Sequence, residues 1–155
     1  IKGIVPPETE NLGFIAGAVF SMMGLAQLVS SSPIGGLVDR IGARKVLITS
    51  LIYVGVLNIP QAYVTDVYQL AAVRFLQGLG LGGMLPALNT FLASKIDKAL
   101  SGQVFAYNQS CQFFGYFIGA VCGSNLMALL GFTTLFWASG LLFIVAAIWV
   151  AFKLK

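Results

Sequence analysis

One cluster of charged side chains holds most of the chemistry that this sequence could perform. Asp39, Arg40, Arg44 and Lys45 place one acid and three bases within seven positions, between two long uncharged stretches. Asp39 can pair with Arg40 or Arg44, or it can meet the positive N-terminal end of a helix. Uncharged stretches of this length can span a bilayer core, so the cluster is expected to lie in a short segment at a membrane surface.

Residue types suited to catalysis or metal binding are scarce in the rest of the chain. The sequence has no histidine, and its uncharged stretches contain no paired carboxylates. Cys111 and Cys122 would lie about 16 Å apart on one helix, which is too far for a disulfide. We therefore expect no enzymatic activity, no cofactor and no metal site.

Glycines recur at a spacing of four residues. Gly78, Gly80 and Gly83 also fit the G-x-G-x-x-G pattern, but they lie inside an apolar stretch and not between a strand and a helix, so we reject nucleotide binding. Glycines four apart let a neighbouring helix approach closely. Helix packing is the expected role of Gly78, Gly82, Gly115, Gly119 and Gly123. A bend used in conformational change, aided by Pro86, is the alternative for the first group.

The elements that carry these residues are predicted to be membrane-spanning helices. The chain is 58 % hydrophobic and only 9 % charged, whereas soluble domains carry about 25 % charged residues. A bilayer core needs about 20 apolar residues per helix. Charges and a turn at Leu130–Gly131 divide the chain into spans of about 11–34, 45–64, 67–94, 101–128 and 132–152. The predicted fold class is an all-α integral membrane protein with five transmembrane helices in one incomplete bundle, residues 1–155. The charged stretch at 35–45 is expected to be a short loop, with Pro33 and Gly35–Gly36 loosening the end of the first span.

The basic residues divide unequally between the two sides of this arrangement. Of the nine Lys and Arg residues, Arg74 lies within a span, Lys2 falls on one side, and the other side receives Arg40, Arg44, Lys45, Lys95, Lys98, Lys153 and Lys155. The acids Glu8, Glu10 and Asp66 fall on the side of Lys2. The positive-inside rule then places residues 35–45 and the C-terminus in the cytoplasm. The bases are too few and too separated for a nucleic-acid interface.

Polar and aromatic side chains inside the spans are candidates for a substrate path. An amide or a charge that faces lipid is costly, so these groups should face protein or water. The candidates are Phe20, Met23, Gln27, Arg74, Gln77, Asn89, Asn108, Gln112, Phe113 and Tyr116. Inter-helix hydrogen bonding is an equal alternative for the amides, and a structurally paired or snorkelling arginine is an alternative for Arg74.

Three motifs resemble those of the major facilitator superfamily. Its cytoplasmic loop motif G-x-L-x-D-R-x-G-R-K is matched at Gly35, Leu37, Asp39, Arg40, Gly42, Arg44 and Lys45, with a mild departure at Ala43. Residues 74–80 resemble the R-x-x-Q-G-x-G pattern of helices four and ten, and residues 105–110 resemble helix eleven of bacterial multidrug efflux permeases.

The resemblance implies that the chain supplies helices eight to twelve of a twelve-helix transporter in the plasma membrane. Helices two to six are the alternative. Because the chain begins at Ile1 and not at Met, we expect an N-terminal portion to be missing. The implied partners are the lipid bilayer, the absent N-terminal bundle, a small-molecule substrate and protons. No acid lies within a span, so the proton-carrying residue should lie in the missing portion.

The resemblance implies export of drugs or metabolites in exchange for protons, by rocking of two bundles about a central site. Many Phe and Met residues and a single embedded Arg favour export. An importer of a sugar or organic anion with the same fold is the alternative, and a membrane scaffold protein without transport is a third possibility.

Overall fold

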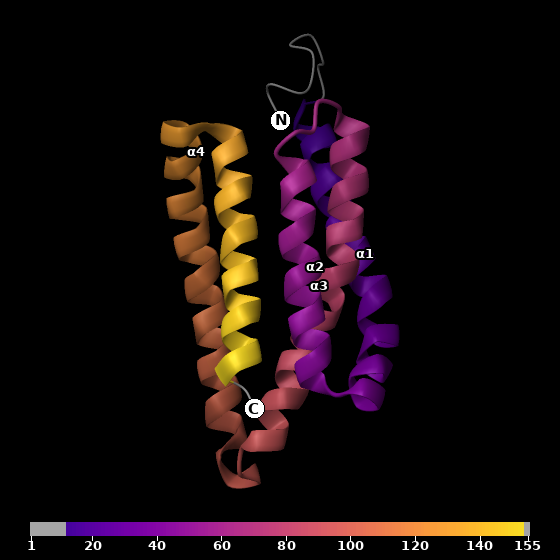
Figure 1. Cartoon of the computed structure of the whole chain (residues 1–155), viewed down its shortest axis with the longest axis vertical. Coiled ribbons are helices and arrows are strands. Elements are labelled where there is room, and N and C mark those ends of the chain that lie inside the picture. Colours follow the sequence, from indigo (N-terminus) through magenta and orange to yellow (C-terminus); the bar gives the residue numbers. More distant parts are fainter. Residues whose placement is uncertain (1–11, 154–155) are drawn as a thin grey trace.

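The computed structural model describes residues 12–153, which form four long α-helices and one short 3-10 helix (Figure 1). The elements are α1 (Leu12–Ile41), α2 (Ala43–Gln61), α3 (Val67–Lys95), η1 (Lys98–Leu100) and α4 (Ser101–Lys153). Each α-helix is long and apolar enough to cross a membrane. The protein is therefore an all-helical membrane protein. Lys2, Glu8, Glu10 and Lys155, which entered the charge argument, lie outside the described residues.

The longest helix, α4, is broken at Gly131. This residue has φ 83° and ψ 170°, a backbone conformation that only glycine adopts without strain. The break divides α4 into residues 101–130 and 132–153, which run in opposite directions (Figure 1). The turn predicted at Leu130–Gly131 coincides with this break, because a glycine between two apolar stretches is the one site where the chain can reverse cheaply.

The junction between α1 and α2 is much shorter than the predicted loop at 35–45. Helix α1 continues through Pro33 and Gly35–Gly36 to Ile41, so these residues do not loosen the end of the helix as expected. Only Gly42 is non-helical, with φ 94°, and Ala43 already begins α2. Backbone hydrogen bonds from the Gly42 N–H to the Val38 carbonyl and from the Val46 N–H to the Gly42 carbonyl run through the turn. These bonds and the burial of Val38 keep the chain helical up to the reversal.

Helix α1 is long enough to extend beyond the apolar core of a bilayer. Its 30 residues correspond to about 45 Å at 1.5 Å per residue, compared with about 30 Å for the hydrocarbon core. The charged residues of the motif therefore occupy the last turn of α1 and the first turn of α2. They lie on the ends of two helices and not in a loop.

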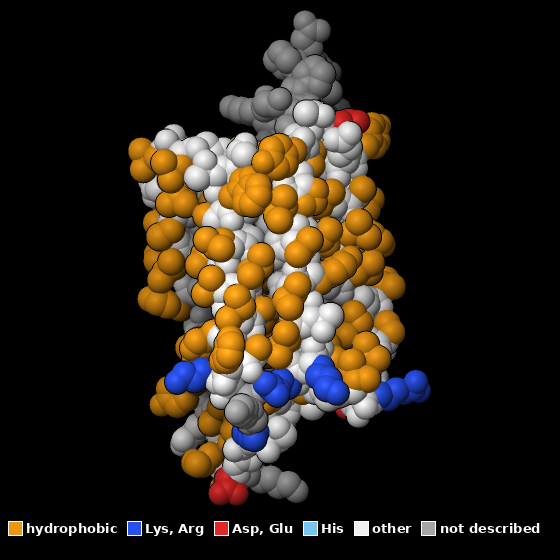
Figure 2. All heavy atoms as spheres, in the orientation of Figure 1, with side chains coloured by type: hydrophobic (Ala, Val, Ile, Leu, Met, Phe, Trp, Pro, Cys, Tyr) orange, Lys and Arg blue, Asp and Glu red, His pale blue; other side chains and the backbone are white. Residues whose placement is uncertain are grey.

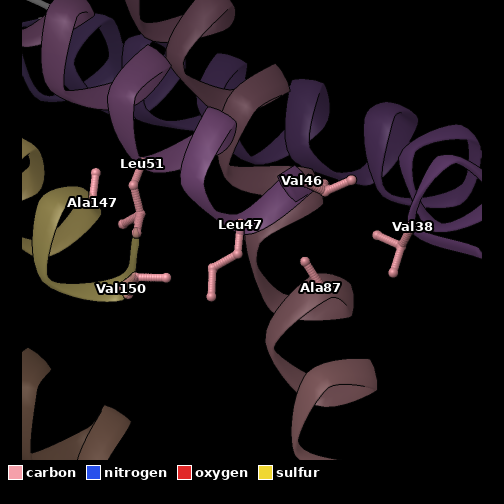
Figure 3. Packing of buried hydrophobic residues seen from close by; sticks show 7 residues of the cluster. All are labelled: Val38, Val46, Leu47, Leu51, Ala87, Ala147 and Val150. Carbon is pink, nitrogen blue, oxygen red and sulfur yellow. The ribbon is translucent and has the colours of Figure 1, made fainter. Parts of the chain in front are cut away.

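The helices pack in a row in which α1 contacts α3, α3 contacts α2, and α2 contacts α4. The part of α4 that meets α2 is residues 132–153, where its buried residues Phe136, Gly140, Ala147 and Val150 are found. One cluster of buried side chains joins all four helices (Figure 3): Val38, Val46, Leu47, Leu51, Ala87, Ala147 and Val150. Residues 101–130 contribute nothing to this cluster.

Basic side chains gather at one end of the molecule (Figure 2). Arg40, Lys95 and Lys153 lie in the last turns of α1, α3 and α4, and Arg44 and Lys45 lie in the first turn of α2. Asp66, at the opposite end, caps the N-terminus of α3 by accepting a hydrogen bond from the Tyr68 N–H at 3.4 Å. The helices thus separate a basic end from an end with little charge.

Candidate functional site

Arg74 carries its charge on α3 between two other helices. Its guanidinium carbon lies 5.3 Å from the centre of the Phe20 ring on α1 and 5.7 Å from that of Phe136 on α4. Its Nη1 atom lies 3.9 Å from the sulfur of Met23. Ring faces attract a cation, and the attraction grows when the pair is shielded from water. Arg74 therefore joins α1, α3 and the second half of α4 through aromatic contacts, as expected of a structurally paired arginine.

The predicted path residue Gln77 is sealed between α2 and α3. It is 6 % exposed and accepts a hydrogen bond of 2.9 Å from the Nε2 atom of Gln61. Gln61 is completely buried, and its Oε1 atom has no hydrogen-bond partner among the described residues. Asn58 is also buried and donates to the Val54 carbonyl at 2.7 Å. The contacts of Gln77 are those of inter-helix hydrogen bonding.

Gln61 and Asn58 were missed as interior polar residues. The available signal was their spacing, because amides three residues apart near the end of a span lie on one helix face. A third contact at this end comes from Thr133, whose hydroxyl donates to the carbonyl of Ala62 at 3.4 Å. Polar contacts thus tie the end of α2 to both α3 and α4.

The other predicted path residues fall into two groups that the structure does not bring together. Phe20, Met23 and Gln27 lie on α1, where Phe20 is exposed and the other two are half-buried, and Asn89 is exposed on α3. In residues 101–130, Asn108 and Gln112 are half-buried, while Phe113 and Tyr116 are exposed and contact each other edge to face. The structure describes no hydrogen bond or ring contact between these two groups. Whether they line one path stays a prediction.

The two predicted glycine stripes have different surroundings. A Cβ atom at Gly78 would overlap the carbonyl oxygen of Met23, and one at Gly82 would overlap the Ser30 hydroxyl and lie 2.8 Å from the Gln27 carbonyl oxygen. The third helix can therefore approach α1 closely only because these residues lack side chains. A Cβ atom would meet nothing within 4 Å among the described residues at Gly115, Gly119 or Gly123.

A close glycine contact that the sequence did not reveal joins α2 to α4. A Cβ atom at Gly140 would lie 2.9 Å from the carbonyl oxygen of Gly55, and one at Gly55 would lie 3.2 Å from that of Gly140. Each glycine stands alone in its span, so no spacing pattern could identify the pair. Only the tertiary arrangement shows that they face each other.

The charged residues between α1 and α2 differ in their surroundings, because one of them is hydrogen-bonded to another helix and three are exposed. Arg44 is half-buried, and its Nη2 atom donates a 2.6 Å hydrogen bond to the Ala151 carbonyl at the C-terminal end of α4. A cation there satisfies an unpaired carbonyl and complements the helix dipole. Asp39, Arg40 and Lys45 are exposed, and none forms an ion pair with another residue in the range 12–153. Gly35 has open space around it, whereas Gly42 provides the positive φ of the turn.

Comparisons with known proteins cover nearly the whole chain. The family described as Major Facilitator Superfamily matches residues 2–155. Multidrug resistance protein MdtG of Enterobacter lignolyticus is 35 % identical over 148 residues, which are 96 % of this chain and 35 % of the relative. Multidrug resistance protein MdtG of Escherichia coli K12 is 40 % identical over 129 residues, 83 % of this chain and 32 % of the relative. The chain thus spans about a third of the length of these curated relatives.

Proposed function

The chain belongs to the Major Facilitator Superfamily, and on this premise we propose that it forms part of a secondary active transporter that exports drugs or metabolites in exchange for protons. The observation that carries the proposal is the identity of 35 % and 40 % to two multidrug resistance proteins. The family consists of membrane transporters and not of enzymes. Small molecules are therefore the expected substrates.

The proposed architecture is five membrane spans that act as helices eight to twelve of a larger bundle in the plasma membrane. Four helices long enough to span and the reversal at Gly131 support the count. The gathering of bases at one end supports a cytoplasmic location for residues 35–45 and the C-terminus. Residues 101–130 support a partner bundle, because Phe113, Tyr116 and Phe117 are each more than 60 % exposed.

The mechanism that we propose assigns different roles to the charges of the junction. Arg44 is bonded to the end of α4 and holds the last helix within its own bundle. Asp39 is exposed on the end of α1, where it can contact the partner bundle. If this contact exists in only one state of a rocking transporter, it biases the alternation of access. The proton-carrying acid belongs to the partner portion in this proposal.

Import of an organic anion is the second candidate, and one observation favours it. Arg74 has aromatic and sulfur neighbours but forms no ion pair among the described residues. A substrate carboxylate could complete its coordination, because buried charges are ordinarily paired. The predicted path residues, from Gln27 and Asn89 on α1 and α3 to Asn108 and Gln112 on α4, are the same in both candidates.

A segment exchange tests export against import. This chain would replace the segment that it matches in the E. coli relative, and the hybrid would be expressed in bacteria that lack their main efflux pumps. We expect energised extrusion of the cationic dye ethidium that stops when a protonophore collapses the proton gradient. Cells that express residues 1–155 without the rest of the transporter are the matched control and should not extrude the dye. A hybrid that reaches the membrane in normal amount and only accumulates organic anions would contradict the proposal.

A further inference from the structure

An apolar cavity of about 270 Å³ lies between α1, α2 and α3, on the half of the bundle that carries the basic end. Ile34, Leu37 and Ile41 form its wall on α1, and Gly80 of α3 closes its inner side. A Cβ atom at Gly80 would overlap the ring of Tyr53, so this glycine provides the room in which the ring lies against α3. The cavity is a consequence of the weak direct packing between α1 and α2, because α1 packs mainly on α3 while α2 packs on both α3 and α4.

The mouth of this cavity faces away from the interior of the bundle. Its inner lining includes Val46, which is 4 % exposed, and Ser50, which is 7 % exposed. The lining residues at the mouth are exposed: Leu37 and Ile41 on α1, and Thr49 and Tyr53 on α2. In a chain that spans a membrane, an opening of this kind between two helices is accessible from the lipid.

The depth of the cavity corresponds to one leaflet of a bilayer. Helix α2 begins at Ala43, and Tyr53 is ten residues further, which corresponds to about 15 Å along the helix axis. Half of a hydrocarbon core of about 30 Å is also about 15 Å. An acyl chain that enters from the basic end would therefore reach the level of Tyr53 near the middle of the membrane.

Two bases flank the mouth at the membrane surface. Lys45 precedes Thr49 by four residues and Tyr53 by eight, so the three form one exposed stripe along α2. Arg40 follows Leu37 by three residues on the same side of α1, and these two residues line a second, smaller hollow. Asp39 lies two residues from Leu37, which at 100° per residue places it on the opposite side of α1. The charge at the mouth is therefore positive.

We propose that this cavity is a binding site for an anionic phospholipid, with one acyl chain between α1 and α2 and the phosphate at Arg40 and Lys45. Basic residues at the membrane surface beside a gap between helices attract anionic headgroups, at about 1 kcal/mol per base. Drug-sized ligands occupy about 300–1,000 Å³ and need several placed polar groups. The lining here is almost entirely apolar and the volume is below that range, which suits an acyl chain. The site is separate from the substrate-path residues, and its occupation does not depend on transport.

Native mass spectrometry tests the proposal by measuring how much lipid binds to the purified full chain. Dioleoyl phosphatidylglycerol, dioleoyl phosphatidylcholine and dioleoylglycerol would be titrated separately in the same detergent. We expect the anionic lipid to bind most tightly. Replacing both bases, Arg40→Gln with Lys45→Gln, should weaken its binding by about 25-fold, since each base contributes about fivefold. The matched control is Lys95→Gln with Lys153→Gln, which removes two exposed charges from the same end but away from the cavity.

Filling the cavity tests the acyl-chain part of the proposal. Thr49→Phe at the mouth should weaken phosphatidylglycerol and dioleoylglycerol alike, and Leu37→Phe on the opposite wall should do the same if the first variant folds poorly. Leu142→Phe, on an exposed position of α4, is the matched control. Circular dichroism verifies that each variant is helical.

Three results would overturn the proposal. The first is equal binding of phosphatidylglycerol and dioleoylglycerol, which would show that the headgroup charge does not contribute, or an equal loss in the two charge variants, which would show a non-specific basic surface. The second is unchanged binding when both cavity-filling variants fold. The third is displacement of the lipid by ethidium in a manner that Thr49→Phe abolishes, which would make the cavity a drug site.

Discussion

Arg74 places a positive charge among apolar helices. The faces of the Phe20 and Phe136 rings lie against its guanidinium and attract the charge. A charge at the centre of a membrane helix costs about 2.5–3.5 kcal/mol on insertion scales. The rings offset part of that cost without a second charge. The same residue therefore serves packing in the structure and remains the strongest candidate for contact with a charged substrate.

A double-mutant cycle measures this compensation. Phe136→Leu should destabilise the protein less in an Arg74→Met background than in the original chain, with a coupling of about 0.5–2 kcal/mol, because the ring attracts the guanidinium. The measurement is the free energy of unfolding in mixed micelles titrated with a denaturing detergent. Phe143→Leu, at a half-buried ring of the central cluster, serves as control and should show no coupling to Arg74. If Phe136 also showed no coupling to Arg74, its ring would not stabilise the guanidinium.

The contact between α1 and α3 depends on glycines whose absent side chains leave room for a neighbouring backbone. We expect Gly82→Ala to destabilise the protein by about 1–3 kcal/mol, because an added methyl group would press on Ser30 and the Gln27 carbonyl. Gly119→Ala is the matched control, since its added methyl group meets no described atom. Thermal unfolding of the purified chain compares the two. Equal midpoints would mean that α1 and α3 do not approach as closely as the structure shows.

The contact between α2 and α3 contains the buried amide pair. Gln77→Leu should destabilise the protein by about 1–3 kcal/mol, because it leaves the Gln61 amide buried with one partner fewer. The double variant Gln61→Leu with Gln77→Leu removes both amides and should be closer to the original stability. The measurement is detergent unfolding of the original chain, the single variants Gln61→Leu and Gln77→Leu, and the double variant. A double variant that loses the sum of the two single effects would show that the amides act independently.

Two of the surfaces that residues 12–153 leave exposed bear on how the molecule assembles. One is the apolar surface of residues 101–130, and the other is the charged end of α1 at Asp39. The chain spans about a third of the length of its curated relatives, and in the transporter that we propose a partner bundle covers both surfaces. The proposed rocking mechanism uses the second surface as its cytoplasmic contact.

Loss of one charge at this contact should slow transport in the segment-exchange hybrid without preventing membrane insertion. A carboxylate at a helix N-terminus is worth about 0.3–1 kcal/mol, so Asp39→Asn should lower the efflux rate by about two- to fivefold. Asp66→Asn is the control, because asparagine also caps a helix and Asp66 lies at the other end of the molecule. Membrane abundance is measured in parallel. An unchanged efflux rate in Asp39→Asn would argue against a contact between bundles at this residue.

Local sequence features predicted the helices well and the contacts between them poorly. Hydropathy and the glycine at 131 were sufficient to place the long helices and the reversal in α4, since both depend on neighbouring residues along the chain. The junction at 35–45 was predicted as a loop because its charges lie between two long uncharged stretches. A single residue, Gly42, makes the turn instead, since packing of Val38 and continuous hydrogen bonds keep α1 helical.

The sequence by itself determined that this protein spans a membrane and that its charges gather at one end, and its motifs pointed to the transporter family. These properties follow from composition and from order along the chain. Only the tertiary structure decided that Arg44 bonds to the end of α4 while Asp39 stays exposed, that Gln77 pairs with Gln61, and that Gly55 faces Gly140. Such pairs join residues on different helices. The physical reason that sequence patterns miss them is that helix packing sets the distance between the two residues, whereas a sequence pattern reveals only the spacing of residues along one helix.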